Sequence, residues 1–194
     1  MHSRRLSSIP PRDSASESRA KLHELASEIE RIQQVGDSSR MAELLTELAV
    51  HNVVVADLTA ARRATIDALR LTDLVEDALV RGRLAIRLGE VCLEVFEAHA
   101  AERCFNTAIA IFDADVRDPR AVDAAARARV GLARALAARS DPSARVVLED
   151  AGTAFEDLGN QEAVRVIDMD LRELAAEIEE SPASFQMLPR PKQT

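Results

Sequence analysis

Residues 84–112 read LAIRLGEVCLEVFEAHAAERCFNTAIAIF, and this segment carries the pattern from which the fold is predicted. Gly89 is followed twelve residues later by Ala101, and then by Phe105 and Ala108 at steps of four and three. Such steps place side chains on one side of an α-helix. A small residue late in one helix lets a second helix cross it closely, and a large residue on the second helix fills the space beside the contact. The segment therefore predicts a tightly packed pair of helices.

The same skeleton of small and apolar residues occurs three times along the chain. Its members are Leu48-Ala49, Ala61, Thr65 and Ala68; Leu88-Gly89, Ala101, Phe105 and Ala108; and Val130-Gly131, Ala144, Leu148 and Ala151. The small-residue anchors lie 40 and 42 residues apart, and the third copy has one extra residue between its anchor and the next alanine. Recurrence at a nearly fixed period indicates an internal repeat, whereas a helical bundle with coincidental alanine spacing would not require this skeleton three times.

These copies resemble the tetratricopeptide repeat, with Phe112 and Phe155 as matching apolar residues at the ends of the second helices. Their spacing exceeds the usual 34 residues. It is similar to the extended repeats of kinesin light chains and of sensor domains in bacterial transcription activators, whose inter-repeat turn the segment AFEDLGN at 154–160 resembles. The resemblance covers roughly residues 41–180. It implies an all-α stack of helical hairpins with about three repeats, an N-terminal helix and a C-terminal capping helix. Phe96 departs from the pattern, since it stands where a turn glycine is common.

Breakpoints in the helical periodicity divide the chain into helices and tails. We expect helices at about 14–35, 39–55, 57–71, 73–96, 98–112, 118–139, 141–158 and 161–180, and no sheet. Ser14 with Glu17 predicts a capping box, Asp57 and Asp73 are expected to cap the third and fourth helices, and Gly36 is expected to end the first. The predicted organisation is a disordered tail at 1–13, an N-terminal amphipathic helix at 14–36, a tetratricopeptide-like repeat domain at 37–180 and a disordered tail at 181–194.

Composition and charge narrow the class of protein. Hydrophobic residues make up 47% of the 194 residues and charged residues 30%, a balance typical of a globular domain. The formal net charge is −8, and because the tails contribute only Arg4, Arg5, Arg12, Arg190 and Lys192, residues 13–180 carry −13. Such an acidic surface disfavours nucleic-acid binding by the folded part. The abundance of Ala, Arg and Asp suggests a bacterial source.

Location and chemistry follow from what the chain contains and lacks. The sequence has neither an apolar run of eighteen residues nor a signal peptide, so we expect a cytoplasmic protein without membrane insertion. Cys92, His99 and Cys104 could suggest a metal site, but a fourth ligand is missing, so we expect no metal or cofactor and two thiols that pack as small hydrophobic groups. No phosphate loop, nucleophile motif or zinc-protease motif occurs, so we do not expect an enzyme.

The resemblance also implies a partner-binding face, because the first helix of each pair lines a concave surface in such stacks. By helical spacing, the predicted partner-binding residues are Val50, Val53, Val54, Arg83, Ile86, Glu90, Leu93, Glu94, Leu132 and Leu136. This face needs a cover, which could be a segment of a partner protein, a second copy in a homodimer, or the chain's own first helix. We expect Val53→Asp or Leu93→Asp to abolish partner capture while leaving helicity intact.

The leading functional hypothesis is a non-enzymatic protein–protein interaction adaptor or scaffold that binds a partner segment in the concave groove. A client-specific, secretion-type chaperone and a regulatory sensor module that binds a small ligand are the alternatives. Constitutive copurification with one unstable client would favour the chaperone. A ligand-dependent rise in melting temperature without protein partners would favour the sensor.

Overall fold

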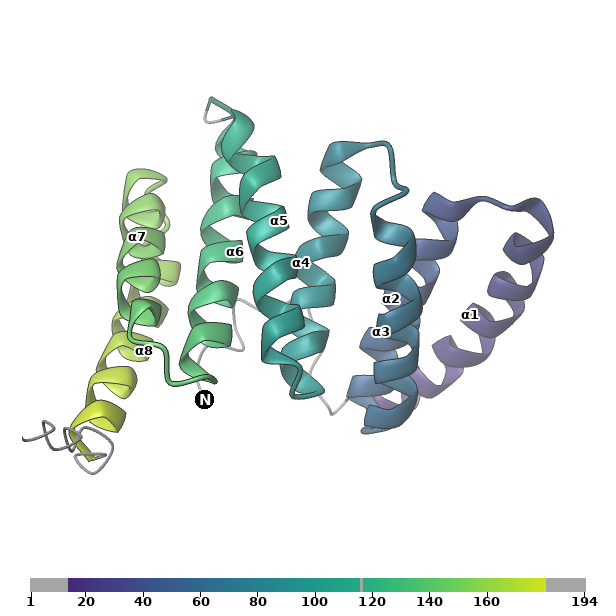
Figure 1. Ribbon diagram of the computed structural model, residues 1–194, viewed down its shortest axis with the longest axis horizontal. Helices are drawn as coiled ribbons and strands as arrows, with labels where there is room; N and C mark the ends of the chain where they lie inside the picture. The colour runs from purple at the N-terminus through teal and green to yellow at the C-terminus, as the bar shows by residue number, and fades with distance from the viewer. Residues whose placement is uncertain (1–13, 116, 181–194) are drawn as a thin grey trace, which may run out of the picture.

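The computed structural model describes residues 14–115 and 117–180, which form α-helices, one short 3₁₀ helix and no strand (Figure 1). The α-helices are α1 (Ala15–Val35), α2 (Ser38–Val54), α3 (Leu58–Thr72), α4 (Ala78–Glu94), α5 (Ala98–Phe112), α6 (Pro119–Ala137), α7 (Ser143–Asp157) and α8 (Gln161–Glu180), and the 3₁₀ helix η3 is Asp113–Asp115. The all-helical prediction is confirmed for these residues. The two predicted disordered tails, 1–13 and 181–194, lie outside them.

The helices form a row in which each one packs against its neighbours in sequence (Figure 1). Successive helices run in opposite directions, so α2 with α3, α4 with α5, and α6 with α7 are antiparallel pairs. The first helices of these pairs also contact one another, α2 with α4 and α4 with α6. Because α1 packs on α2 and α8 packs on α7, the amphipathic helices at the two ends cover the outer pairs.

All four predicted helix-end signals can be compared with the capping geometry, and two of them, at Ser14 and Asp73, were wrong. Gly36 ends α1 as expected, in the left-handed conformation with its N–H donating to the carbonyl oxygen of Ile32. Ser14 makes no side-chain capping hydrogen bond, so the predicted capping box is absent. Asp73 follows α3 instead of starting α4, and Asp77 caps α4 by accepting hydrogen bonds from two backbone N–H groups.

The delayed start of α4 has a packing reason. Val75, in the connection between α3 and α4, is buried against Ala42 of α2 and Leu84 of α4. The carbonyl oxygen of Val75 also accepts a hydrogen bond of 2.6 Å from Arg81 Nη1. An extended connection inserts this side chain between two helices, which a helix begun at Asp73 would not allow.

The turn that joins the helices of each pair has the same geometry every time. The residues that adopt the left-handed conformation are Ala56 (φ 66°), Phe96 (φ 63°), Ser140 (φ 56°) and, between α7 and α8, Gly159 (φ 71°). In each turn the next residue donates its N–H to a carbonyl oxygen five residues earlier, at 2.9, 2.8, 3.0 and 2.8 Å respectively. This is the Schellman motif of helix C-termini. Because the motif recurs, the chain leaves the first helix of each pair in the same direction.

Phe96 is the least suited of these turn residues, because it holds a bulky side chain in the left-handed region with 86% of its surface exposed. The left-handed conformation costs a residue with a side chain about 1–2 kcal/mol, whereas glycine loses about 0.5–1 kcal/mol more entropy on folding. We therefore expect Phe96→Gly to raise the free energy of unfolding by about 0.5–1 kcal/mol in urea denaturation. Gly159→Ala, the reverse change in a turn of the same type with open space around it, should lower it by about 1 kcal/mol. A shift in the same direction for both variants would contradict this account.

The core is organised around Phe105 of α5, which is fully buried. Its ring lies between Gly89 of α4 and Gly131 of α6. A Cβ atom added to Gly89 would lie 2.8 Å from the ring, and one added to Gly131 would overlap it. Glycine is therefore required at both positions because the backbones of α4 and α6 both approach the same aromatic ring closely. Two of the small-residue anchors recognised in the sequence thus meet at one side chain.

Candidate interaction surface

Most of the ten predicted partner-binding side chains lie in the interior. The six buried ones are Val50, Val53, Val54, Glu90, Leu132 and Leu136. Val50 and Val53 pack with Ala61 and Ala64 of α3 and with Val91 of α4. The side of α2 that carries them therefore faces its neighbours in the row, so a partner could not contact these valines in this conformation.

Leu132 and Leu136 of α6 are buried for a similar reason. Both belong to the cluster that surrounds Phe105, which also includes Ala128 and Ala135. The sequence placed them at an apolar end of the groove, and the structure places them against the middle pair of helices. Leu132 and Leu136 therefore act as core residues beneath the neighbouring surface.

Four of the predicted residues remain at the surface, all on α4. Arg83 is exposed, and Ile86, Leu93 and Glu94 are half-buried. Steps of three or four residues lead from Arg83 to Ile86, Glu90 and Glu94, and Leu93 lies seven residues after Ile86, so these side chains share one face of the helix. Ile86 and Leu93 rest on the cluster around Phe105, so their outer surfaces are held in place by the core. We call Arg83, Ile86, Glu90, Leu93 and Glu94 the α4 face.

Glu90 lies in the middle of the α4 face with only 7% of its surface exposed. Counted from the small-residue anchors, it corresponds to Val50 of α2 and to Leu132 of α6, both of which are apolar and buried. An acidic residue at a position that is apolar in the other copies is not explained by packing. A carboxylate that interrupts the apolar pattern of the repeat in this way is a candidate for function.

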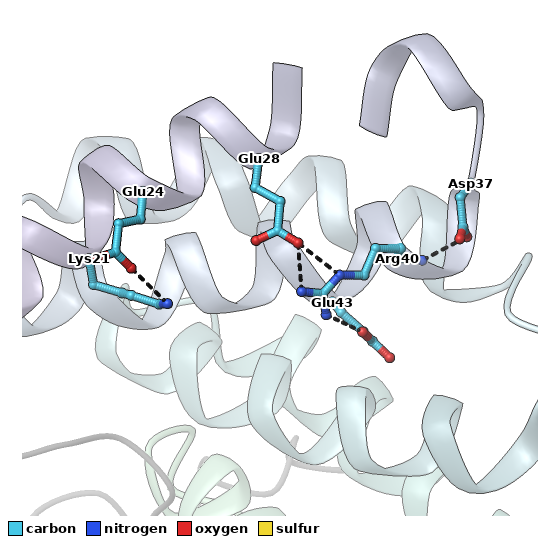
Figure 2. Close-up of polar contacts among 6 residues, drawn as sticks. All are labelled: Lys21, Glu24, Glu28, Asp37, Arg40 and Glu43. Carbon is cyan, nitrogen blue, oxygen red and sulfur yellow. Dashed lines mark hydrogen bonds and ion pairs between the residues drawn. The ribbon is translucent and has the colours of Figure 1, made fainter. Parts of the chain in front are cut away.

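The N-terminal helix α1 is held to α2 by polar contacts that the sequence did not predict (Figure 2). Arg40 of α2 donates to Glu28 of α1 at 2.8 Å through Nη2 and to Glu43 of its own helix at 2.8 Å through Nη1. The hydrogen bond from Arg40 lowers the pKa of the Glu28 carboxyl group, and its two carboxylate partners raise the pKa of Arg40. These groups are partly exposed, so they orient α1 on α2 more than they stabilise it.

A second contact joins the beginning of α1 to the end of α2. Nδ1 of His51 and Oγ of Ser18 lie 3.1 Å apart, and Ser18 is buried. Burial lowers the pKa of His51 below its usual 6.5, with Arg87 and Lys21 acting in the same direction and Glu47 opposing them. His51 is therefore neutral in the packed state at neutral pH.

The lowered pKa of His51 predicts a pH dependence of stability. Below about pH 6.5 the unfolded chain binds a proton at His51 that the folded chain resists, so the free energy of unfolding should fall as the pH drops from 7.5 to 5.5. The shifted carboxyl groups Glu28 and Asp141 titrate below this window. Urea denaturation at the two pH values measures the loss, and His51→Gln should reduce it. An equal loss in the variant would assign the effect to other groups.

The two cysteines face each other between α4 and α5. Cys92 and Cys104 are free thiols, both buried, which confirms that they pack as core residues. Their mutual hydrogen bond and burial raise the pKa of Cys92. Over the described ranges, no group of three or more His, Cys, Asp or Glu residues is arranged to hold a metal ion.

None of the helices in the described part of the chain is long and apolar enough to cross a membrane. The sequence matches no protein-family model and no curated protein.

Proposed function

We propose that the chain is a tetratricopeptide-like repeat protein with about three repeats, formed by α2 with α3, α4 with α5, and α6 with α7. The three sequence skeletons fall on these pairs in register, and each pair is joined by the same left-handed turn. The position of Phe105 between Gly89 and Gly131 supports the proposal further, because it links one pair to the next through the small-residue anchors. In a stack of this kind each repeat buries its apolar surface against its neighbours.

The function that we propose is that of a non-enzymatic adaptor or scaffold, which binds a segment of another protein on the α4 face. The observation that carries this is the composition of that face. Ile86 and Leu93 offer fixed apolar surface, and the half-buried Glu94 places negative charge beside it. Apolar contacts supply affinity and the charges restrict which segment fits.

Crosslinked affinity capture from the native cell tests this proposal, with Leu93→Asp compared with Leu79→Asp. Leu79 lies at the opposite end of α4 and is 56% exposed, so its substitution is a matched control on the same helix. We expect the Leu93 variant to lose the captured protein at least tenfold and the Leu79 variant to retain it. Equal capture by both folded variants would contradict the proposed surface. Capture of a single protein that aggregates without this chain would instead identify a chaperone.

A further inference from the structure

The C-terminal half of the α4 face is suited to a basic segment with apolar residues. Leu93 and Glu94 lie in the last turn of α4, and this turn contains no basic residue. The carbonyl end of a helix carries partial negative charge, which adds to the charge of Glu94. Arg83 lies at the other end of the face and would repel a cation there. A cationic ligand is therefore directed to Glu94 and its neighbours.

The N-terminal end of α1 lies at the same end of the stack. The contact between Ser18 and His51 places the beginning of α1 beside the C-terminal part of α2. Helix α2 contacts α4 and runs in the same direction, so the last turns of both helices lie at one edge of the row (Figure 1). The chain that precedes α1 is consequently attached one helix away from Glu94.

The residues that precede α1 have the complementary chemistry and sufficient length. Residues 4–12 read RRLSSIPPR, with three arginines, two apolar residues and no acid. A chain of ten residues spans up to about 33 Å when extended. Neighbouring helix axes are about 8–10 Å apart, so the segment can reach across α2 to α4. Consecutive prolines favour the extended conformation that this path requires.

We propose that residues 4–12 of this chain occupy the α4 face, with the arginines directed at Glu94 and with Leu6 and Ile9 on the apolar surface of Leu93 and Ile86. The segment thereby competes with the partner protein for the same surface. This competition rests on the proposed function, whereas the occupation of the face does not. A partner can then bind only when the segment is displaced. The segment therefore lowers the apparent affinity of the α4 face for the partner protein.

Paramagnetic relaxation in the intact chain tests the occupation of the face. A nitroxide label on Ser8→Cys reports its surroundings, because the native thiols Cys92 and Cys104 are buried and react poorly. We expect the methyl signals of Leu93 and Ile86 to be broadened and those of Leu79, about 21 Å away along α4, to be retained.

Two charge variants test whether the broadening depends on the proposed ionic contact. The double substitution Arg4→Glu, Arg5→Glu and the single substitution Glu94→Lys should each restore most of the Leu93 and Ile86 signal. Glu156→Lys, an exposed change on α7, should leave the broadening as it is. The proposal is overturned if Leu93 is broadened no more than Leu79, or if the charge variants have no effect.

Partner capture tests separately whether the segment competes with the partner protein. With both proposals correct, the Arg4→Glu, Arg5→Glu variant should capture several times more partner than the unaltered chain at the same concentration. Broadening with unchanged capture would support the occupied face and contradict the partner site there. Unbroadened methyl signals with capture that depends on Leu93 would overturn the occupied face and support the partner site.

Discussion

The Val53→Asp variant is expected to lose most or all of its stability, with a far-ultraviolet circular dichroism spectrum that shows reduced helicity at neutral pH. Val53 is 3% exposed and packs between α2, α3 and α4. A carboxylate at this position would lie among apolar side chains, and burying an unpaired charge in a core costs about 3–5 kcal/mol, of the same order as the whole stability of a typical domain. Thermal and urea denaturation measure the loss.

Leu93→Asp is the comparison that makes this result informative. Leu93 is half-buried at the surface of α4, so the new carboxylate can remain in water, and we expect a loss of only about 1–2 kcal/mol. A Val53 variant with the urea midpoint of the unaltered chain would contradict the observed packing of α2. The expectation from the sequence was that both substitutions leave helicity intact, and the burial of Val53 now separates them.

Gly131→Ala is expected to destabilise the protein by about 3 kcal/mol, at the upper end of the effect of overpacking a core. The added methyl group overlaps the Phe105 ring, which is also in close contact with Gly89. Because the ring is fully buried and packed within a core cluster, moving it aside would disturb its other contacts. Urea denaturation gives the change in the free energy of unfolding.

Gly152→Ala is the matched control, since Gly152 also lies within a helix. A Cβ atom there would be 3.5 Å from Ile167, an ordinary contact. We expect this variant to be neutral or more stable by about 0.5–1 kcal/mol, because alanine is the better helix former. Both glycine variants behaving alike would mean that the close approach at Gly131 is not as described.

A second substitution isolates the contact between Gly131 and Phe105. Phe105→Leu alone removes a large buried side chain and should be destabilising, but it also makes room for a methyl group at position 131. The double variant should therefore be more stable than the sum of the two single losses predicts, by about 1–2 kcal/mol in a double-mutant cycle. Additive losses would show that Gly131→Ala acts through something other than the ring.

The helix boundaries and the packing anchors could be predicted from the sequence because both depend on local signals. Periodicity and small residues identified the antiparallel pairs, and Asp57 caps α3 as expected, accepting a hydrogen bond of 2.9 Å from the Ala60 N–H group. The capping prediction failed at Asp73, where the burial of Val75 delays the next helix. Such burial depends on residues of α2 and α4, which the local pattern does not contain.

The burial of most of the predicted partner-binding residues could not be inferred from the sequence, because a helix in the middle of a row has neighbours on several sides. Helical spacing places Val50 and Val53 on one face, but it does not say that α3 and α4 cover that face. The contact between Glu28 and Arg40 was also missed. Opposite charges twelve residues apart were the available signal, and only the path of the chain around Gly36 brings them together.

The most direct test of the proposed interaction surface is photocrosslinking in the native cell with a photoreactive amino acid at position 93. A second sample with the same amino acid at position 79 serves as the control, since both positions lie on α4 and 79 is the more exposed. We predict that position 93 crosslinks to a distinct protein and that position 79 does not. Crosslinking that is equal at both positions, or absent at position 93 while the protein is captured by other means, would contradict binding at the α4 face.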